Sequence, residues 1–246
     1  MARGHASTRE SAVRPAWRGA DSTRSSRTVR VRRVDFRYLA IEGPPGLGKS
    51  ALADRLGTRL DASVVLDETE NPFLADAYAG RAGAAFQTQL FTLLGRHRQQ
   101  GQLRQGDLFA QATVSDYLFD RDKIYAYVTL DDNELFIYQR LFDLLVRDIA
   151  APDVVVYLQA PADVVYRRVK QGGKIHPERP LPDQTFVREI SDAYNHFFFH
   201  YTATPLLVVE TSQVEPDWPD AAVDEILRQI QGMTGGTRYY VPRLER

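Results

Sequence analysis

One eight-residue segment constrains the fold more than any other part of this 246-residue chain. Residues 43–50 read Gly43-Pro44-Pro45-Gly46-Leu47-Gly48-Lys49-Ser50 and fit the pattern GxxxxGK[ST]. The segment follows an apolar run at 38–41 and opens a run of helical periodicity at 50–60. Glycines in such a loop let backbone N–H groups converge on a phosphate at a helix N-terminus, where the helix dipole favours an anion. The sequence therefore predicts a strand, a phosphate-binding loop and a helix in direct succession.

Short runs rich in β-branched residues alternate with longer stretches of helical periodicity along the rest of the chain. The expected strands are 38–42, 63–66, 108–114, 154–159 and 206–210. The expected helices are 48–60, 72–79, 84–100, 117–126, 133–149, 161–170, 183–201 and 218–231. Strands separated by helices pair in parallel through right-handed crossovers. We therefore expect an α/β fold, a three-layer sandwich with a five-stranded parallel sheet.

The formal net charge of -1 hides a difference between the N-terminal segment and the rest of the chain. Residues 1–34 contain nine arginines against Glu10 and Asp21, a balance of +7, whereas the other 212 residues carry 22 basic and 30 acidic side chains. We expect a disordered basic tail at 1–34, with an organelle transit peptide as the alternative. A single folded domain is expected at 35–232, followed by a loose segment at 233–246.

Composition excludes several classes of protein. The chain has no cysteine, so it has no disulfide framework, thiol nucleophile or cysteine-ligated metal site, and we expect a reducing compartment, the cytoplasm. It also lacks an apolar run long enough to span a membrane and the apolar core of a secretory signal. The acidic composition after residue 34 argues against a nucleic-acid partner, because phosphate neutralisation needs clustered Lys and Arg.

The phosphate loop predicts the use of ATP and Mg²⁺. Lys49 would place a positive charge at the β- and γ-phosphates, and the Ser50 hydroxyl would be a magnesium ligand. The chain has no NKxD-type guanine-reading sequence and no LSGGQ-like signature, so phosphoryl transfer to a small acceptor is the leading reaction class. Such an enzyme needs a base for the acceptor hydroxyl, a carboxylate on the magnesium side and cations near the γ-phosphate.

The candidate base follows the second expected strand, which runs into Asp67-Glu68-Thr69-Glu70-Asn71-Pro72-Phe73. Ligands of open α/β sheets bind beyond the carboxyl ends of the strands, so an acid at this point faces the phosphate loop. Glu68 is the first candidate and Asp67 the second. Asn71 is interpreted as the cap of the next helix, with Pro72 at its first position.

Residues 37–232 resemble the deoxynucleoside kinase family, in particular its bacterial deoxyadenosine/deoxyguanosine kinase branch. The stretches that carry the resemblance are IEGPPGLGKS at 41–50, DETENPF at 67–73, the helical region from Tyr78 to Arg96, SDYLFDRDKIYA at 115–126 and the loop from Arg168 to Glu178. The resemblance implies transfer of a phosphoryl group from ATP to the 5′-hydroxyl of a deoxyribonucleoside, with a purine preferred, in nucleotide salvage. It also implies a homodimer.

The resemblance assigns roles to individual residues. The acid after the second strand would take the 5′-hydroxyl proton, Tyr78 would hold the sugar 3′-hydroxyl, and Gln89 would bind the nucleobase. Arg96 lies seven residues beyond Gln89, two helical turns away on the same face. Asp116 would be the magnesium-side carboxylate and Asp122 an acid near the nucleobase.

Two motifs depart from the family pattern. Tyr117 occupies a position where the family has Arg, and Arg121, four residues later, would deliver a guanidinium to the same region. An ordinary surface ion pair in the charged run 120–123 is the alternative for Arg121. In the lid over ATP, Arg168 and Lys174 match cationic positions, Gly172 replaces a second Arg, and Glu178 matches an acid that reaches the sugar. This lid is expected as an exposed loop between two helices.

Three other interpretations are disfavoured by the residues present. His196 and His200 have the spacing of metal ligands, but no HExxH glutamate accompanies them and aromatic residues surround them, so we interpret them as part of a packed helix. A nucleoside monophosphate kinase would need additional arginines for the acceptor phosphate, and residues 67–96 offer only Arg81 and Arg96. A non-catalytic ATP-binding subunit would not explain Glu68 together with Asp116.

Overall fold

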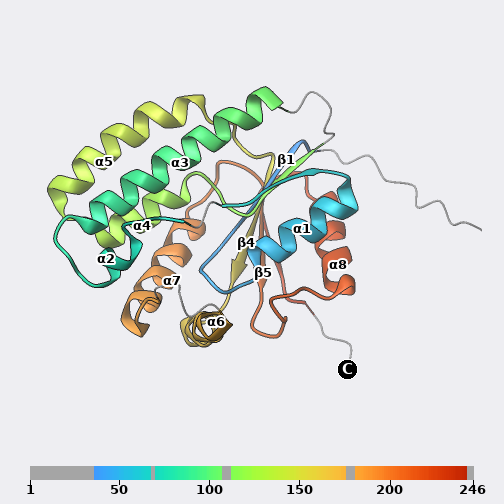
Figure 1. The fold of residues 1–246 in the computed structure, drawn as a ribbon. Coiled ribbons are helices and arrows are strands. Elements are labelled where there is room, and N and C mark those ends of the chain that lie inside the picture. Colours follow the sequence, from blue (N-terminus) through green and yellow to red (C-terminus); the bar gives the residue numbers. More distant parts are fainter. Residues whose placement is uncertain (1–35, 68–69, 107–111, 176–180, 243–246) are drawn as a thin grey trace, which may run out of the picture. The chain divides into compact units, whose positions relative to one another are not determined.

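A sheet of parallel strands forms the centre of the fold (Figure 1). The computed structural model describes residues 36–67, 70–106, 112–175 and 181–242. Within them the strands are β1 (Tyr38–Glu42), β2 (Ser63–Val65), β3 (Thr113–Ser115), β4 (Val154–Gln159), β5 (Leu206–Glu210) and β6 (Thr237–Tyr240). Their spatial order is β2-β3-β1-β4-β5-β6, and every neighbouring pair is parallel. The predicted α/β class is confirmed.

Helices connect the strands and cover both faces of the sheet. They are α1 (Lys49–Leu60), α2 (Leu74–Tyr78), α3 (Ala84–Gly106), α4 (Arg121–Thr129), α5 (Asp132–Leu145), α6 (Ala162–Ile175), α7 (Gln184–Phe199) and α8 (Asp220–Gln231), with a short 3₁₀ turn, η1, at Val146–Asp148. None of the helices within the described ranges is both long and apolar enough to cross a membrane.

Alternate residues of the buried strands contact opposite layers, as the period of two in a strand requires. In β4, Val154, Val156 and Leu158 pack in the cluster that contains the apolar faces of α1 and α8. Val155 and Tyr157 pack on the other face with residues of α4 and α7. Both faces are therefore buried, which explains why these strands are continuously apolar rather than alternating.

A further layer lies outside α4. Leu93 of α3 and Tyr138 and Phe142 of α5 form a separate apolar cluster with Phe119 and Ala126. Figure 1 shows α3 and α5 side by side, with α4 between them and the sheet. A capping box begins α5: the Asp131 side chain accepts from the backbone N–H of Glu134, and the Glu134 carboxylate accepts from the backbone N–H of Asp131.

The expectation of five strands is wrong, because β6 adds a sixth at the edge of the sheet. This strand lies in the segment that we expected to be a loose end. It pairs in parallel with β5, and the Arg238 guanidinium donates to the carbonyls of Gln229 and Gly232 at the end of α8. The open edge of β5 supplies unpaired backbone groups for this pairing, which local periodicity does not reveal.

Several expected boundaries also differ, three of them in segments that carry candidate site residues. Helix α6 continues through Gly172 and Gly173 to Ile175, so the start of the expected lid loop is helical. Glycine lowers helix propensity by only about 1 kcal/mol, which neighbouring turns can offset. Helix α4 begins at Arg121 rather than at 117, so Tyr117 precedes the helix. The third strand starts at Thr113, and residues 108–111 lie outside the described part of the chain.

Candidate active site

The phosphate loop lies between β1 and α1, as the motif predicted. Gly48 precedes the first residue of α1 and has a φ of 75°, a left-handed conformation that glycine adopts without strain. A Cβ at Gly48 would also collide with the carbonyl of Pro216. The Lys49 ammonium donates to the carbonyls of Gly43 (2.8 Å) and Pro44 (3.1 Å), so it lies within the curve of the loop.

Ser50 and Asp116 meet beside this loop. The Ser50 hydroxyl donates to Oδ2 of Asp116 at 2.5 Å, and Oδ1 of Asp116 accepts from the backbone N–H of Asp67 at 2.6 Å. The carboxylate therefore connects the start of α1 with the ends of β2 and β3. A hydroxyl and one carboxylate suit Mg²⁺, which binds through one or two protein oxygens together with phosphates and water. The predicted magnesium ligands thus lie together and fit the ion.

Asp67 lies at the centre of an ionic cluster. Arg96 donates to it twice, from Nε to Oδ1 at 2.9 Å and from Nη2 to Oδ2 at 2.6 Å. Arg121 donates from Nη1 to Oδ2 at 2.7 Å, and the remaining Nη1 of Arg96 donates to Oδ1 of Asp122. Side chains from the end of β2 and from α3 and α4 therefore converge at the carboxyl edge of the sheet.

Burial and the neighbouring charges shift the acid–base properties of this cluster. Burial would raise the pKa of Asp67, but the positive charges of Arg96 and Arg121 outweigh it and hold the pKa well below its ordinary value. Burial raises the pKa of Asp122 to about 6, against the opposing effect of Arg96. Burial lowers the pKa of Lys49 to about 8, and the charge of Arg121 acts in the same direction. Asp67 is therefore ionised at neutral pH.

Tyr117 supports Arg96 where the family pattern has an arginine. The Arg96 guanidinium lies 5.1 Å from the centre of the Tyr117 ring. The Tyr117 hydroxyl donates to Gln99 (2.8 Å) and accepts from Gln100 (3.0 Å), both on α3. Arg121 brings a second guanidinium to Asp67, and its side chain is only 16% exposed, so the alternative of a surface ion pair within the run 120–123 is wrong.

The residues expected to bind the nucleoside lie on α2, α3 and α4. Tyr78 is half-buried, and its ring packs edge-to-face on Phe186 with centroids 5.7 Å apart. Gln89 is buried, and its Nε2 donates to the Thr129 hydroxyl at 3.3 Å. The structure brings Arg96 and Asp122 together, as noted above. The candidates Glu68 and Glu178 lie outside the described residues.

The two lid cations have different environments. The Arg168 guanidinium donates to the carbonyls of Thr211 (2.9 Å) and Val214 (2.6 Å), in the connection after β5. Its Cβ lies against Gly46, so Arg168 is adjacent to the phosphate loop. Lys174 is exposed near the end of α6. Arg168 therefore joins the β5–α8 connection to α6 in this conformation.

Two residues of the site were missed from the sequence. Trp218 is fully buried with a φ of 57°, and its Nε1 donates to the Gly48 carbonyl at 2.9 Å. A bulky residue rarely adopts a positive φ, and no local pattern revealed this contact across 170 residues. Glu42, the last residue of β1, is also fully buried. A carboxylate that ends an otherwise apolar strand beside a phosphate loop was a signal that could have identified it.

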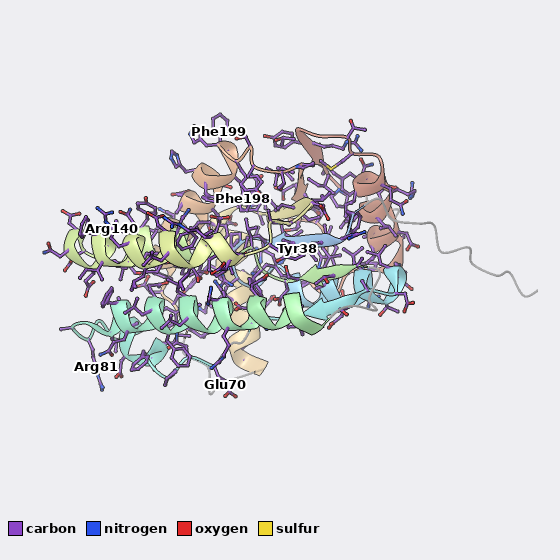
Figure 2. The ribbon with its side chains drawn as sticks, turned by 90° about the horizontal axis from the view of Figure 1, so that it is seen from above. Tyr38, Glu70, Arg81, Arg140, Phe198 and Phe199 are labelled. Atoms are coloured by element: carbon purple, nitrogen blue, oxygen red, sulfur yellow. The ribbon has the colours of Figure 1, made fainter. Side chains whose placement is uncertain are left out.

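Both arginines of residues 67–96 pair with carboxylates, so neither offers a free guanidinium to an acceptor monophosphate. Arg81 pairs with Asp76 and is 70% exposed, and Figure 2 shows its side chain extending outward at the edge of the molecule. Arg96 is buried between Asp67 and Asp122. Among the described residues of 67–96, no arginine is therefore left to bind an acceptor phosphate.

Comparisons of this chain with known proteins all point to the same family. The model of the family described as deoxynucleoside kinase matches residues 39–233. A deoxyguanosine kinase of Bacillus subtilis (strain 168) is 29% identical over 143 residues, which cover 56% of this chain and 67% of that protein. A deoxyadenosine kinase of Dictyostelium discoideum is 28% identical over 148 residues, which cover 58% of this chain and 59% of that protein.

Solved structures share the fold. A deoxyadenosine kinase from M. mycoides with the products dCMP and dCDP has a TM-score of 0.66 at 20% identity, covering 80% of this chain and all of that one. The same enzyme with bound dATP has a TM-score of 0.65 at 20% identity, covering 79% of this chain and all of that one. The family model spans both the phosphate loop and the Asp67 cluster, and its members are nucleotide-using enzymes that phosphorylate deoxynucleosides. This confirms the resemblance seen in the sequence: the chain belongs to the deoxynucleoside kinase family.

Proposed function

We propose that the enzyme transfers the γ-phosphate of ATP to the 5′-hydroxyl of a purine deoxyribonucleoside, in nucleotide salvage. The observation that carries this proposal is the convergence of Asp67, Arg96 and Arg121 with the Ser50–Asp116 pair beside the phosphate loop. A carboxylate for the acceptor hydroxyl, a magnesium-side carboxylate and cations are the three components that this reaction requires.

Asp67 is proposed as the group that accepts the hydroxyl proton, with Glu68 as the alternative. Among the described contacts, Oδ1 of Asp67 accepts one hydrogen bond and Oδ2 accepts two, which leaves an acceptor position on Oδ1. Its low pKa makes Asp67 a weak base. Phosphoryl transfer through a loose transition state depends mainly on positioning and electrostatics, so a well-placed weak base suffices.

Lys49, Ser50 and Asp116 are proposed to act on the donor. Lys49 would leave the loop carbonyls and bind the β- and γ-phosphates, while Ser50 and Asp116 would hold Mg²⁺. The ion, when bound, neutralises charge that develops on the phosphate oxygens. Arg121, which contacts Asp67, would stabilise the transferring group.

The purine preference rests on the nucleobase side of the site and on the two curated relatives, which are named for deoxyguanosine and deoxyadenosine. Gln89 and Asp122 are buried polar side chains: Asp122 pairs with Arg96, and Gln89 lies two helical turns before Arg96 on α3. An amide can recognise a base edge through two hydrogen bonds. Such buried polar groups penalise a substrate that leaves them unpaired.

The test is phosphoryl transfer from labelled ATP to a panel of four deoxynucleosides and four deoxynucleoside monophosphates. We expect deoxyadenosine or deoxyguanosine to have the highest kcat/KM and the monophosphates to give no product. A Gln89→Ala variant should lower kcat/KM for the purine substrate by about tenfold to a hundredfold, since one good base contact contributes about 1–3 kcal/mol. A pyrimidine deoxynucleoside as the best substrate would contradict the purine assignment, and product from no deoxynucleoside would contradict the proposal.

We also propose a homodimer that uses the outer helices α3 and α5. Both figures show these helices side by side. They expose Leu94 (55%), Phe136 (58%), Ile137 (49%) and Leu144 (60%), and the Arg140 guanidinium covers the Phe136 ring at 5.2 Å. Large apolar side chains exposed on neighbouring helices favour an interaction surface. A second copy of the chain is the partner that the family resemblance implies.

Light scattering during gel filtration tests this assembly. The wild-type chain should elute with twice the chain mass of 27.9 kDa, and Ile137→Glu combined with Leu144→Glu should give the monomer, because a charge buried in an interface is strongly unfavourable. Tyr239→Glu, at an exposed position of β6, is the matched control and should stay dimeric. A monomeric wild-type protein, or a dimer that survives the double substitution, would rule out this interface.

We propose that residues 35–232 form the kinase domain, that residues 1–34 are dispensable for activity, and that the enzyme is cytoplasmic. The absence of cysteine and the basic composition of 1–34 support these assignments.

A further inference from the structure

Glu42 is a buried carboxylate to which the mechanism above gives no role. It is the last residue of β1, and its exposed fraction is 0%. Its Oε1 accepts from the Gly43 N–H (2.9 Å) and the Tyr194 hydroxyl (2.9 Å), and its Oε2 accepts from the Leu118 N–H (2.7 Å). Removing a carboxylate from water is so costly that it is tolerated only with hydrogen bonds and an opposite charge. The three donors satisfy the first requirement.

Arg121 supplies the opposite charge. Its Nε lies 3.8 Å from Oε1 of Glu42, while its Nη1 donates to Asp67 at 2.7 Å. This Nε is buried and has no hydrogen-bond partner among the described residues. The guanidinium is therefore held between two carboxylates, Asp67 in the candidate site and Glu42 behind it. The Tyr125 ring, 5.0 Å from the guanidinium carbon, limits its movement further.

The contacts of Glu42 join four parts of the site. Gly43 is the first residue of the phosphate loop, Leu118 lies in the turn before α4, and Tyr194 belongs to α7. Arg121 is the first residue of α4. A displacement of the carboxylate would shift the start of the phosphate loop relative to the guanidinium that faces Asp67. Reacting groups tolerate little misplacement, since about 1 Å can cost about a hundredfold in rate.

We propose that Glu42 is a positioning residue for phosphoryl transfer, which fixes the first peptide of the phosphate loop and holds Arg121 against Asp67. Glu42 acts through these two groups rather than on the substrate. A glutamine cannot replace it, because the Gln amide would place its NH₂ against either the Gly43 N–H or the Leu118 N–H. An aspartate would keep the charge but not reach all three donors. The inference rests on the proposed use of ATP.

A double-mutant cycle between Glu42→Gln and Arg121→Ala in the full-length enzyme tests this role. We expect Glu42→Gln to lower kcat by about a hundredfold with a change in KM for the nucleoside below about threefold, because alignment rather than substrate binding is lost. In the Arg121→Ala background the same substitution should lower kcat by a smaller factor, about tenfold, because the part of the effect that acts through Arg121 is absent and the part that acts through the Gly43 N–H remains. Tyr194→Phe is the matched control, because it keeps the charge of Glu42 and the two backbone N–H groups that Glu42 accepts from. We expect its kcat to lie within about threefold of the wild-type value.

The outcomes separate positioning from simple stabilisation. All rates are compared at a temperature where circular dichroism shows each variant to be folded. A Glu42→Gln loss that is equal in both backgrounds, a loss matched by Tyr194→Phe, or no loss at all would overturn the inference. If Glu42→Gln does not fold, Glu42→Asp enters the same cycle under the same criteria. Calorimetric titration of the wild-type enzyme with MgATP distinguishes failure of this inference from failure of the proposed function. A wild-type enzyme that binds no ATP would contradict the proposed function, not the role of Glu42.

Discussion

Exchange of Lys49 for methionine is expected to lower kcat by about 10²–10³-fold, the loss typical of removing one preorganised group that stabilises transition-state charge. Lys49 is the cation enclosed by the phosphate loop, where its ammonium lies 2.8 Å from the Gly43 carbonyl. Methionine retains the length and the apolar stem but provides no charge for the phosphates. Steady-state kinetics with ATP and the best nucleoside of the panel measures the effect.

The fold should survive this substitution. The Lys49 ammonium is desolvated in the structure, and burial lowers its pKa to about 8, so its charge adds little to stability. We expect a thermal unfolding midpoint equal to or slightly above that of wild type. Lys123→Met is the control, because Lys123 pairs with Asp120 at a partly exposed position. Wild-type kcat in Lys49→Met would contradict the assignment of the phosphate loop as the ATP site.

Replacement of Asp67 by asparagine is expected to lower both activity and stability. Loss of a positioned base lowers kcat by about 10²–10⁴-fold. Loss of one partner from a buried ion pair costs about 3–5 kcal/mol, because the remaining charge is left uncompensated. Here Arg96 retains Asp122 and Arg121 retains Glu42, so we expect the lower end, about 3 kcal/mol, of that range. Urea denaturation and steady-state kinetics measure the two effects.

Glu68→Gln distinguishes the two candidate bases. If Asp67 accepts the proton, Glu68→Gln keeps most of the activity and the full stability, whereas a larger kcat loss in Glu68→Gln than in Asp67→Asn would assign the base to Glu68.

The stability effect of Asp67→Asn should also depend on pH. The pKa of Asp67 is lower in the folded protein than its ordinary value of 3.8, so its stabilisation is present above that pH and is lost as the pH falls below it.

Much of the fold was predictable because its signals are local. The phosphate loop is a contiguous motif whose chemistry depends on neighbouring residues, and the strands at 154–159 and 206–210 were found at their observed bounds from their apolar runs. Strand β6 was not predicted, since Thr237-Arg238-Tyr239-Tyr240 has no strand periodicity and forms only against the open edge of β5. The helix through Gly172 and Gly173 was missed because glycines normally mark a loop.

By itself, the sequence determined the α/β class, the phosphate loop and the family, since these follow from residue order and short-range periodicity. The tertiary structure alone decided which charged and polar side chains meet. Asp67 and Arg121 are 54 positions apart, and Glu42 and Tyr194 are 152 apart. Their contacts exist because parallel strands bring the ends of β1, β2 and β3 to one edge of the sheet, where α3, α4 and α7 deliver their side chains. The pairing of a buried carboxylate with a particular arginine depends on that three-dimensional convergence, which no local pattern encodes.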